Sequence, residues 1–221
     1  MDAVIHLAAY QDYLPDFAKF FHVNTVGTAL LYELIVEQRY PIQKVVVASS
    51  QAVYGEGKYV CQQHQVQYPG PRAEEQLRAS RWELTCPVCG GPLELRRTDE
   101  THVNPHNQYA ISKYTQEMIA LSLGRRYQIP SVALRFSITQ GPRQSFRNAY
   151  SGILRLFTMA MLHWDAPVVY EDGQQMRDYV NVGDVARGIE LVLLDARADY
   201  RPFNVGGKEA VRVLDLSLIH I

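Results

Sequence analysis

The 221-residue sequence has few cysteines, almost no net charge and no long apolar segment. Three cysteines do not suggest the disulfide framework that holds small secreted domains together. A formal net charge of −1 gives no indication of a nucleic-acid or membrane partner. No apolar run approaches the length of a bilayer span, and no signal peptide is recognisable. We therefore expect a cytoplasmic protein that binds neither nucleic acid nor membranes.

Hydrophobic residues make up 47% of the chain, which is enough for a sizeable buried core. Short apolar runs typical of buried strands alternate with segments of helical periodicity. The expected strands are residues 4–8, 44–49, 131–136 and 203–205, and the expected helices are residues 16–38, 107–127, 150–163 and 184–194. This alternation predicts an α/β fold, a Rossmann-type parallel sheet flanked by helices.

One polar segment interrupts the alternation and defines the expected domains. Residues 1–55 and 99–136 form the Rossmann core, residues 137–215 form a partial second lobe with the closing core elements, and residues 56–98 form an insertion. The sequence starts within a strand-like run and stops soon after another, so we expect natural segments to be missing at both ends. We expect residues 216–221 to be a non-native tail with no structural role.

Tyr109 and Lys113 are four residues apart on an expected helix, a spacing that places both side chains on one face. A nearby ammonium favours the phenolate and lowers the tyrosine pKa from its usual value near ~10. Such a tyrosine exchanges a proton with a substrate hydroxyl near neutral pH. Most pairs with this spacing are ordinary helix surface, so the pattern needs support from other segments.

That support comes from two expected strand ends. Ser49 and Ser50 end one buried strand, and Ala8 and Ala9 end another. Ligands bind at the carboxyl edge of open parallel sheets. The alternative interpretation is that Ser50 only caps a turn and that Asn24 is an ordinary polar helix residue.

Several motifs in order resemble those of the extended short-chain dehydrogenase/reductase family. They are residues 2–9, Asn24 with residues 27–28, residues 49–55, Tyr109 with Lys113, residues 134–136 with 141–143, residues 177–185 and residues 203–207. The resemblance covers nearly all of the chain outside the insertion. It implies a Rossmann-type NAD domain and a small lobe that binds a nucleotide-sugar substrate.

The resemblance also implies a role for each matching residue. Tyr109 would be the catalytic acid/base, Lys113 would lower its pKa and hold the nicotinamide ribose, and Ser50 would hydrogen-bond the reacting oxygen. The implied NAD contacts are Ala8, Ala9, Asn24, Ser49, Tyr109 and Lys113, and the implied substrate contacts are Gln51, Arg143 and Arg177. The two arginines would bind the diphosphate as bidentate donors. Family analogy further implies a homodimer through the Tyr109 helix.

The chain departs from the family pattern in two places. The glycine-rich phosphate loop and the acidic residue for the adenine ribose are absent, and relatives carry both before the segment that starts at Met1. The choice between NAD and NADP therefore stays open. Relatives also usually carry an asparagine where Ile138 stands, which puts one substrate contact in doubt.

The residues after Ser50 indicate which reaction to expect. Dehydratases of the family carry an Asp-Glu pair there, whereas Gln51 and Ala52 cannot titrate. We therefore expect 4-epimerisation of a nucleotide sugar, by transient oxidation at C4 and return of the hydride. Residues 137–144 and the insertion most resemble those of dTDP-L-rhamnose 4-epimerase-like proteins. The alternatives are a sugar-nucleotide reductase or dehydrogenase, and a non-catalytic NAD(H)-binding sensor.

The insertion carries all three cysteines in a paired pattern. A C-x-x-H and a C-x-x-C pair each lie in an expected tight turn between strand-like runs, and the four side chains are those of Cys61, His64, Cys86 and Cys89. Two such turns that face each other supply the four ligands of a tetrahedral zinc ion. A closed set of four protein ligands predicts a structural zinc, in a ribbon-like insertion over the substrate mouth.

Two alternatives to this zinc site stay open. His102 or His106 follows nearby and is an alternative ligand to His64. The other alternative is a loop that binds no metal, with three reduced cysteines and a surface histidine.

Overall fold

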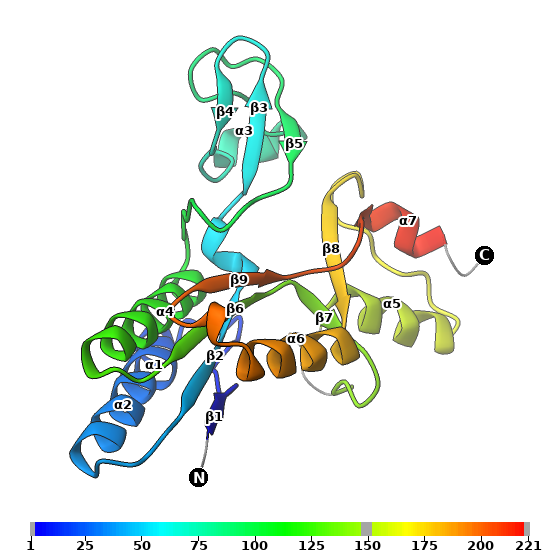
Figure 1. Ribbon diagram of the computed structural model, residues 1–221. Coiled ribbons are helices and arrows are strands. Elements are labelled where there is room, and N and C mark those ends of the chain that lie inside the picture. Colours follow the sequence, from blue (N-terminus) through cyan, green and yellow to red (C-terminus); the bar gives the residue numbers. More distant parts are fainter. Residues whose placement is uncertain (1–2, 147–151, 219–221) are drawn as a thin grey trace.

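Four parallel strands form the central sheet of the protein. The computed structural model describes residues 3–146 and 152–218 (Figure 1). The sheet order is β1-β2-β6-β9, and the strands are β1 (Ala3–His6), β2 (Lys44–Ser50), β6 (Ser131–Phe136) and β9 (Pro202–Val205). Each strand pairs with its neighbour in parallel, so the Rossmann-type sheet expected from the sequence is confirmed.

Helices cover both faces of this sheet (Figure 1). One face carries α1 (Phe17–Phe20), a π-helical segment (Phe21–Val26), α2 (Gly27–Glu37) and α4 (Gln108–Tyr127). The other carries α6 (Val182–Leu194) and a 3₁₀ turn (Ala196–Ala198). Because successive side chains of a strand point to opposite faces, Val45 and Val47 pack against α2 and α4, whereas Val46 packs against α6.

The second lobe contains a smaller mixed sheet in the order β10-β8-β7. Its elements are β7 (Ile138–Gln140), α5 (Ile153–Leu162), β8 (Met176–Asn181), β10 (Ala210–Arg212) and α7 (Val213–Leu218). Leu216 is buried in one cluster with Phe157 and Val213. Leu216 thus contributes to the packing of the second lobe, residues 219–221 lie outside the described part, and the expectation that residues 216–221 are a non-native tail stays a prediction.

The insertion forms a separate arm that projects from the body (Figure 1). A 3₁₀ turn (Gln51–Tyr54) leads into β3 (Lys58–Cys61), β4 (Gln65–Gln67), α3 (Glu74–Arg78) and β5 (Glu94–Arg96), with an antiparallel sheet in the order β4-β3-β5. Residues 82–84, just before the C-x-x-C pair, form no strand, and Thr85 and Pro92 next to them form an isolated bridge.

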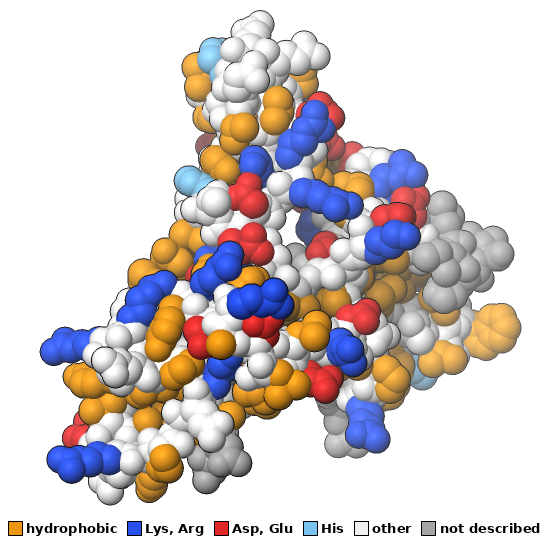
Figure 2. Space-filling view, in the orientation of Figure 1, with side chains coloured by type: hydrophobic (Ala, Val, Ile, Leu, Met, Phe, Trp, Pro, Cys, Tyr) orange, Lys and Arg blue, Asp and Glu red, His pale blue; other side chains and the backbone are white. Residues whose placement is uncertain are grey.

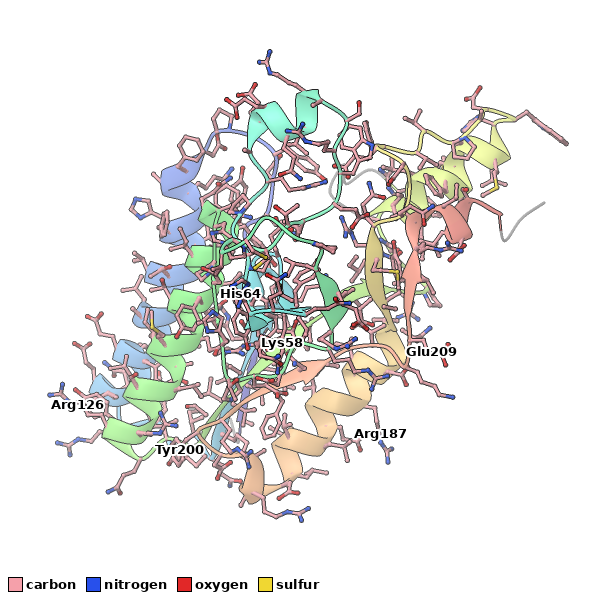
Figure 3. The ribbon with its side chains drawn as sticks, turned by 90° about the horizontal axis from the view of Figure 1, so that it is seen from above. Lys58, His64, Arg126, Arg187, Tyr200 and Glu209 are labelled. Atoms are coloured by element: carbon pink, nitrogen blue, oxygen red, sulfur yellow. The ribbon has the colours of Figure 1, made fainter. Side chains whose placement is uncertain are left out.

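The arm begins at a glycine that no other residue replaces easily. Gly55 has φ +62°, and a Cβ there would collide with the Asn104 carbonyl and the His106 ring. This close approach brings the two ends of the insertion together. Seen from above, Lys58 and His64 of the arm lie over the middle of the molecule, between α4 and β8 (Figure 3).

Candidate active site

Helix α4 packs against β2 and against the turn of residues 51–54 that follows it. Asn107 caps the helix, since its Oδ1 accepts a hydrogen bond of 2.9 Å from the Ala110 amide. Tyr109 therefore lies in the first turn and Lys113 one turn further along. The helix expected from the sequence is present, with the predicted catalytic pair on one face.

Lys113 is almost completely buried, with 1% of its surface exposed. Its Nζ donates a hydrogen bond of 2.5 Å to Gln116 Oε1, and no carboxylate pairs with it within the described residues. Burial lowers the pKa of Lys113 from its usual 10.5 to about 8. Burial, and secondarily the Lys113 charge, also lowers the pKa of His6, so this neighbouring ring is neutral at pH 7.

Removal of the Lys113 charge is expected to stabilise the protein at neutral pH. Lys113→Met should raise the free energy of unfolding at pH 7 by up to about 3 kcal/mol, less the cost of leaving the buried Gln116 Oε1 without its donor, because one unit of pKa shift corresponds to about 1.4 kcal/mol. Between pH 8 and 10.5 the unfolded wild type holds more protons than the folded one, so its stability rises with pH. The variant should therefore lose this advantage over the wild type above pH 10.5, as urea unfolding at several pH values would show.

Lys44 provides the matched control for this substitution. It is also buried, but its Nζ lies 2.6 Å from Asp199 and donates to the carbonyls of Val192 and Asp195 at 3.0 Å. Lys44→Met should therefore destabilise the protein, because it leaves these acceptors without their donor. A stability difference between Lys113→Met and the wild type that stays constant from pH 7 to above pH 10.5 would contradict the assignment of Lys113 as an uncompensated charge.

Ser50 is the last residue of β2 and caps the following turn. Its Oγ accepts a hydrogen bond of 3.2 Å from the Ala52 amide. Ser50 therefore does cap a turn, as the alternative interpretation holds. Because its Oγ is the acceptor in this bond, the hydroxyl can still donate its proton to a substrate oxygen. Gln51, the next residue, is half-buried at the same sheet edge.

Asn24 and Ser49 are buried, and both are bonded within the protein. The Asn24 amide is 0% exposed and bonds the Tyr10 backbone, at 2.7 and 3.0 Å, and Ser112 Oγ at 3.0 Å. The Ser49 hydroxyl donates to Glu117 Oε2 at 2.9 Å. The polar side-chain atoms of both residues are thus bonded within the core, and their contact with NAD stays a prediction. Asn24 holds the loop after β1 against α4.

A buried polar network lies directly behind the site. Arg135 and Glu117 form a bidentate ion pair with N–O distances of 3.0 and 2.5 Å, and both side chains are 3% exposed. Arg135 also donates to Tyr54 Oη at 2.8 Å, and Tyr54 donates to Asn204 Oδ1 at 2.6 Å. Together with Ser49, the network joins β2, α4, β6 and β9.

The sequence interpretation missed this network, although one signal for it was present. Glu117 follows Lys113 by four residues, so Tyr109, Lys113 and Glu117 share one face of α4. A carboxylate on a face that packs against a buried strand requires a partner, and Arg135 lies in the adjacent strand. The pairing itself depends on how α4 sits over β6.

The two predicted phosphate-binding arginines are on different elements. Arg143 is exposed and lines a pocket of about 220 Å³ together with Leu154 and Thr158. Arg177 is exposed on β8, where its guanidinium donates to the Met176 carbonyl at 2.9 Å. The role of the pair as a diphosphate clamp stays a prediction.

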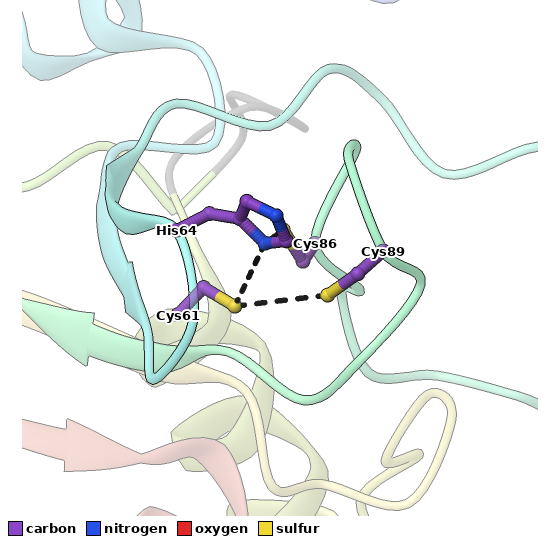
Figure 4. A group of neighbouring side chains, drawn as sticks. All are labelled: Cys61, His64, Cys86 and Cys89. Atoms are coloured by element: carbon purple, nitrogen blue, oxygen red, sulfur yellow. Dashed lines mark hydrogen bonds between the residues drawn. The ribbon is translucent and has the colours of Figure 1, made fainter.

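The predicted metal ligands come together in the arm (Figure 4). Their ligand atoms all lie within 4.8 Å of one another, and the residues are Cys61, His64, Cys86 and Cys89. The two alternative histidines lie elsewhere. His102 stacks on Tyr68 with ring centroids 3.7 Å apart, and His106 packs beside Gly55.

The residues at the sheet edge fit the nicotinamide end of NAD. Ala8 and Ala9 are exposed after β1, and their small side chains leave room for a flat ring. Asn24 ties the same loop to Ser112, the residue before Lys113. The loop after β1, the turn after β2 and α4 thus pack together at the carboxyl edge of a parallel sheet, where ligands of this fold bind.

Sequence and structure comparisons identify the family and the fold of the chain. The sequence profile of the NAD dependent epimerase/dehydratase family matches residues 1–74 and 84–206. A dTDP-L-rhamnose 4-epimerase of Burkholderia thailandensis is 32% identical over 99% of the chain, which spans 60% of that relative. A UDP-N-acetylglucosamine 4-epimerase from Methanobrevibacter ruminantium has a TM-score of 0.71 at 26% identity, over 99% of this chain and 59% of that one.

A third relative shares the fold at lower identity. The dTDP-glucose 4,6-dehydratase from Bacillus anthracis has a TM-score of 0.68 at 24% identity, over 98% of this chain and 55% of that one. None of the described helices is long and apolar enough to cross a membrane. With the profile match over most of its length, the chain belongs to the NAD dependent epimerase/dehydratase family.

Proposed function

We propose that the protein catalyses the NAD-dependent 4-epimerisation of a nucleotide-activated sugar. The observation that carries the proposal is that Tyr109 and the buried Lys113 lie on one face of α4, the helix that packs against β2 and against the turn that follows Ser50. The relatives that support it are sugar-nucleotide 4-epimerases and dehydratases.

Each of these three residues has a defined task in such a reaction. Bound NAD would accept a hydride from the sugar C4 and return it to the other face of the ring. Tyr109 takes the proton of the C4 hydroxyl and gives it back afterwards. Lys113 favours the phenolate through its charge, and the Ser50 hydroxyl donates a hydrogen bond to the reacting oxygen.

The two residues after Ser50 favour epimerisation over elimination. A 4,6-dehydratase must also remove a proton from C5 and protonate a leaving hydroxyl at C6, which requires further acid/base groups. Gln51 carries an amide and Ala52 a methyl group, and neither exchanges protons near pH 7. The chemistry available next to Ser50 is therefore that of oxidation and re-reduction alone.

The surroundings of the sheet edge fit a large, charged substrate. The space-filling view is hollowed between the arm and the second lobe, with basic and acidic side chains on the visible rim (Figure 2). Arg72 of the arm bridges to Glu171 of the lobe with two N–O distances of 2.9 Å. We propose a dTDP-linked 6-deoxy sugar as substrate, with Arg143 and Arg177 as its diphosphate contacts, in line with the Burkholderia relative.

The test is incubation of the enzyme with dTDP-L-rhamnose and catalytic NAD, followed by NMR of the sugar nucleotide. We expect the C4 epimer to accumulate to a constant ratio from either direction, without net change in NADH absorbance. Steady consumption of NADH would assign the protein as a reductase. NAD binding without any sugar conversion, also with other 4-hydroxy sugar nucleotides, would favour a sensor and contradict the proposal.

A further inference from the structure

The arm has almost no hydrophobic core of its own. Among residues 56–98, all of which the structure describes, the buried residues are Pro69, Cys61 and Cys86. Its three strands have three or four residues each, and α3 has five. Segments this short and polar bury too little apolar surface to offset the entropy lost on ordering. Some other interaction must therefore hold the arm in one conformation.

The buried cysteines are part of a compact group of four potential ligands. Cys61 Sγ lies 3.8 Å from Cys89 Sγ and 3.7 Å from His64 Nδ1, and Cys86 Sγ lies 3.7 Å from the same nitrogen (Figure 4). For tetrahedral zinc, bond lengths of about 2.3 Å to sulfur and about 2.0–2.1 Å to nitrogen place two sulfurs about 3.8 Å apart and sulfur and nitrogen about 3.6 Å apart. These three separations match the edges of such a tetrahedron, and all four ligand atoms lie within 4.8 Å of one another.

A disulfide or a thiol–imidazole hydrogen bond fits these contacts less well. A disulfide requires an S–S distance of about 2.05 Å, and 3.8 Å between Cys61 and Cys89 is far longer. Two sulfurs, from Cys61 and Cys86, are equally distant from the single atom His64 Nδ1, which makes at most one hydrogen bond to a thiol in a neutral ring. A single metal ion bonded to the nitrogen and to both sulfurs accounts for the two S–N distances.

The backbone around Cys86 and Cys89 forms the tight turn that such a site needs. The Gly90 amide donates to the Cys86 carbonyl at 2.8 Å, and the Cys86 amide donates to the Gly91 carbonyl at 2.8 Å. Gly90 has φ +70°, a conformation that favours glycine. The turn directs both sulfurs to one side, toward the β3–β4 hairpin that carries Cys61 and His64.

We propose that the arm binds one structural zinc ion through Cys61, His64, Cys86 and Cys89. Four protein ligands close the coordination sphere, so the ion has no open position for a substrate or water and takes no part in epimerisation. Its role is to join the β3–β4 hairpin to the turn at residues 86–91, in place of a hydrophobic core. The site is independent of the proposed sugar chemistry, and its test does not rely on activity.

The test is metal analysis of the full chain purified without chelator. We expect about one zinc per chain, and loss of that zinc in Cys86→Ser with Cys89→Ser. Removal of the metal from the wild type by a chelator should expose three reactive thiols and open residues 62–92 to protease, and added zinc should reverse both effects. Replacement of the zinc by Co(II) should give the intense visible absorption of a tetrahedral thiolate site.

The histidines provide a matched pair of variants. His64→Ala should lose its zinc at a chelator concentration at which the wild type keeps its zinc. At the same concentration His102→Ala should keep about one zinc per chain. The chelator and Co(II) measurements use unmodified protein, so they decide the proposal even if a cysteine variant fails to fold. A wild type that lacks zinc and binds no Co(II), or a cysteine double variant that keeps its zinc, overturns it.

Discussion

Tyr109→Phe is expected to reduce turnover by about 10²–10⁴-fold while NAD binding stays nearly unchanged, because only the exchangeable phenolic proton is lost. The substitution leaves the aromatic ring in the first turn of α4. Steady-state conversion of the nucleotide sugar, followed by NMR, measures turnover, and calorimetric titration with NAD measures the affinity for the cofactor.

Tyr114 supplies the control for this variant. It lies on the same helix, five residues further along, and its side chain is half-buried. Tyr114→Phe also removes one phenolic hydroxyl but should leave turnover within about twofold, since general acid/base catalysis needs the hydroxyl within reach of the substrate. If Tyr109→Phe retained wild-type turnover, Tyr109 would not be the catalytic acid/base.

Glu117→Gln is expected to lower the free energy of unfolding by about 3–5 kcal/mol, because it leaves the buried Arg135 charge without its counter-ion. Both side chains are 3% exposed, and the amide keeps the shape of the carboxylate, so the substitution removes the charge with little change in packing. Urea unfolding of the variant and the wild type at pH 7 measures the difference.

Two further variants separate the effect of the buried charge on stability from other effects of a Glu→Gln substitution. Glu74 pairs with Arg78 on the surface of α3, with side chains 72% and 77% exposed, so Glu74→Gln should change stability by less than about 0.5 kcal/mol. Glu117→Leu combined with Arg135→Met should recover part of the loss, since the pair is replaced by apolar groups. Full stability of Glu117→Gln would show that the ion pair contributes little.

The core elements of the fold were predictable because their signals are local. The expected helix at residues 107–127 is α4, and the expected strand at residues 131–136 is β6. Strands and helices of this kind follow from hydrophobic periodicity within each segment. The structure tests neither the expected homodimer nor the cytoplasmic location, and both stay predictions.

The sequence alone was sufficient to predict which residues lie together when only a few positions separate them along the chain. Tyr109 and Lys113 share a helix face because they are four residues apart, and the C-x-x-H and C-x-x-C pairs bring their ligands together within single turns. The family motifs also identified Ser50 at a strand end, where β2 indeed ends.

The polar contacts between distant segments, in contrast, emerged only from the folded chain. Asn24 bonds Ser112, 88 residues away, and Glu117 pairs with Arg135 on a neighbouring strand. Such contacts depend on how α4 packs over the sheet, which no local pattern specifies. The same packing buries Lys113 and thereby lowers its pKa, so the electrostatic state of the candidate site is a property of the folded protein rather than of the motif.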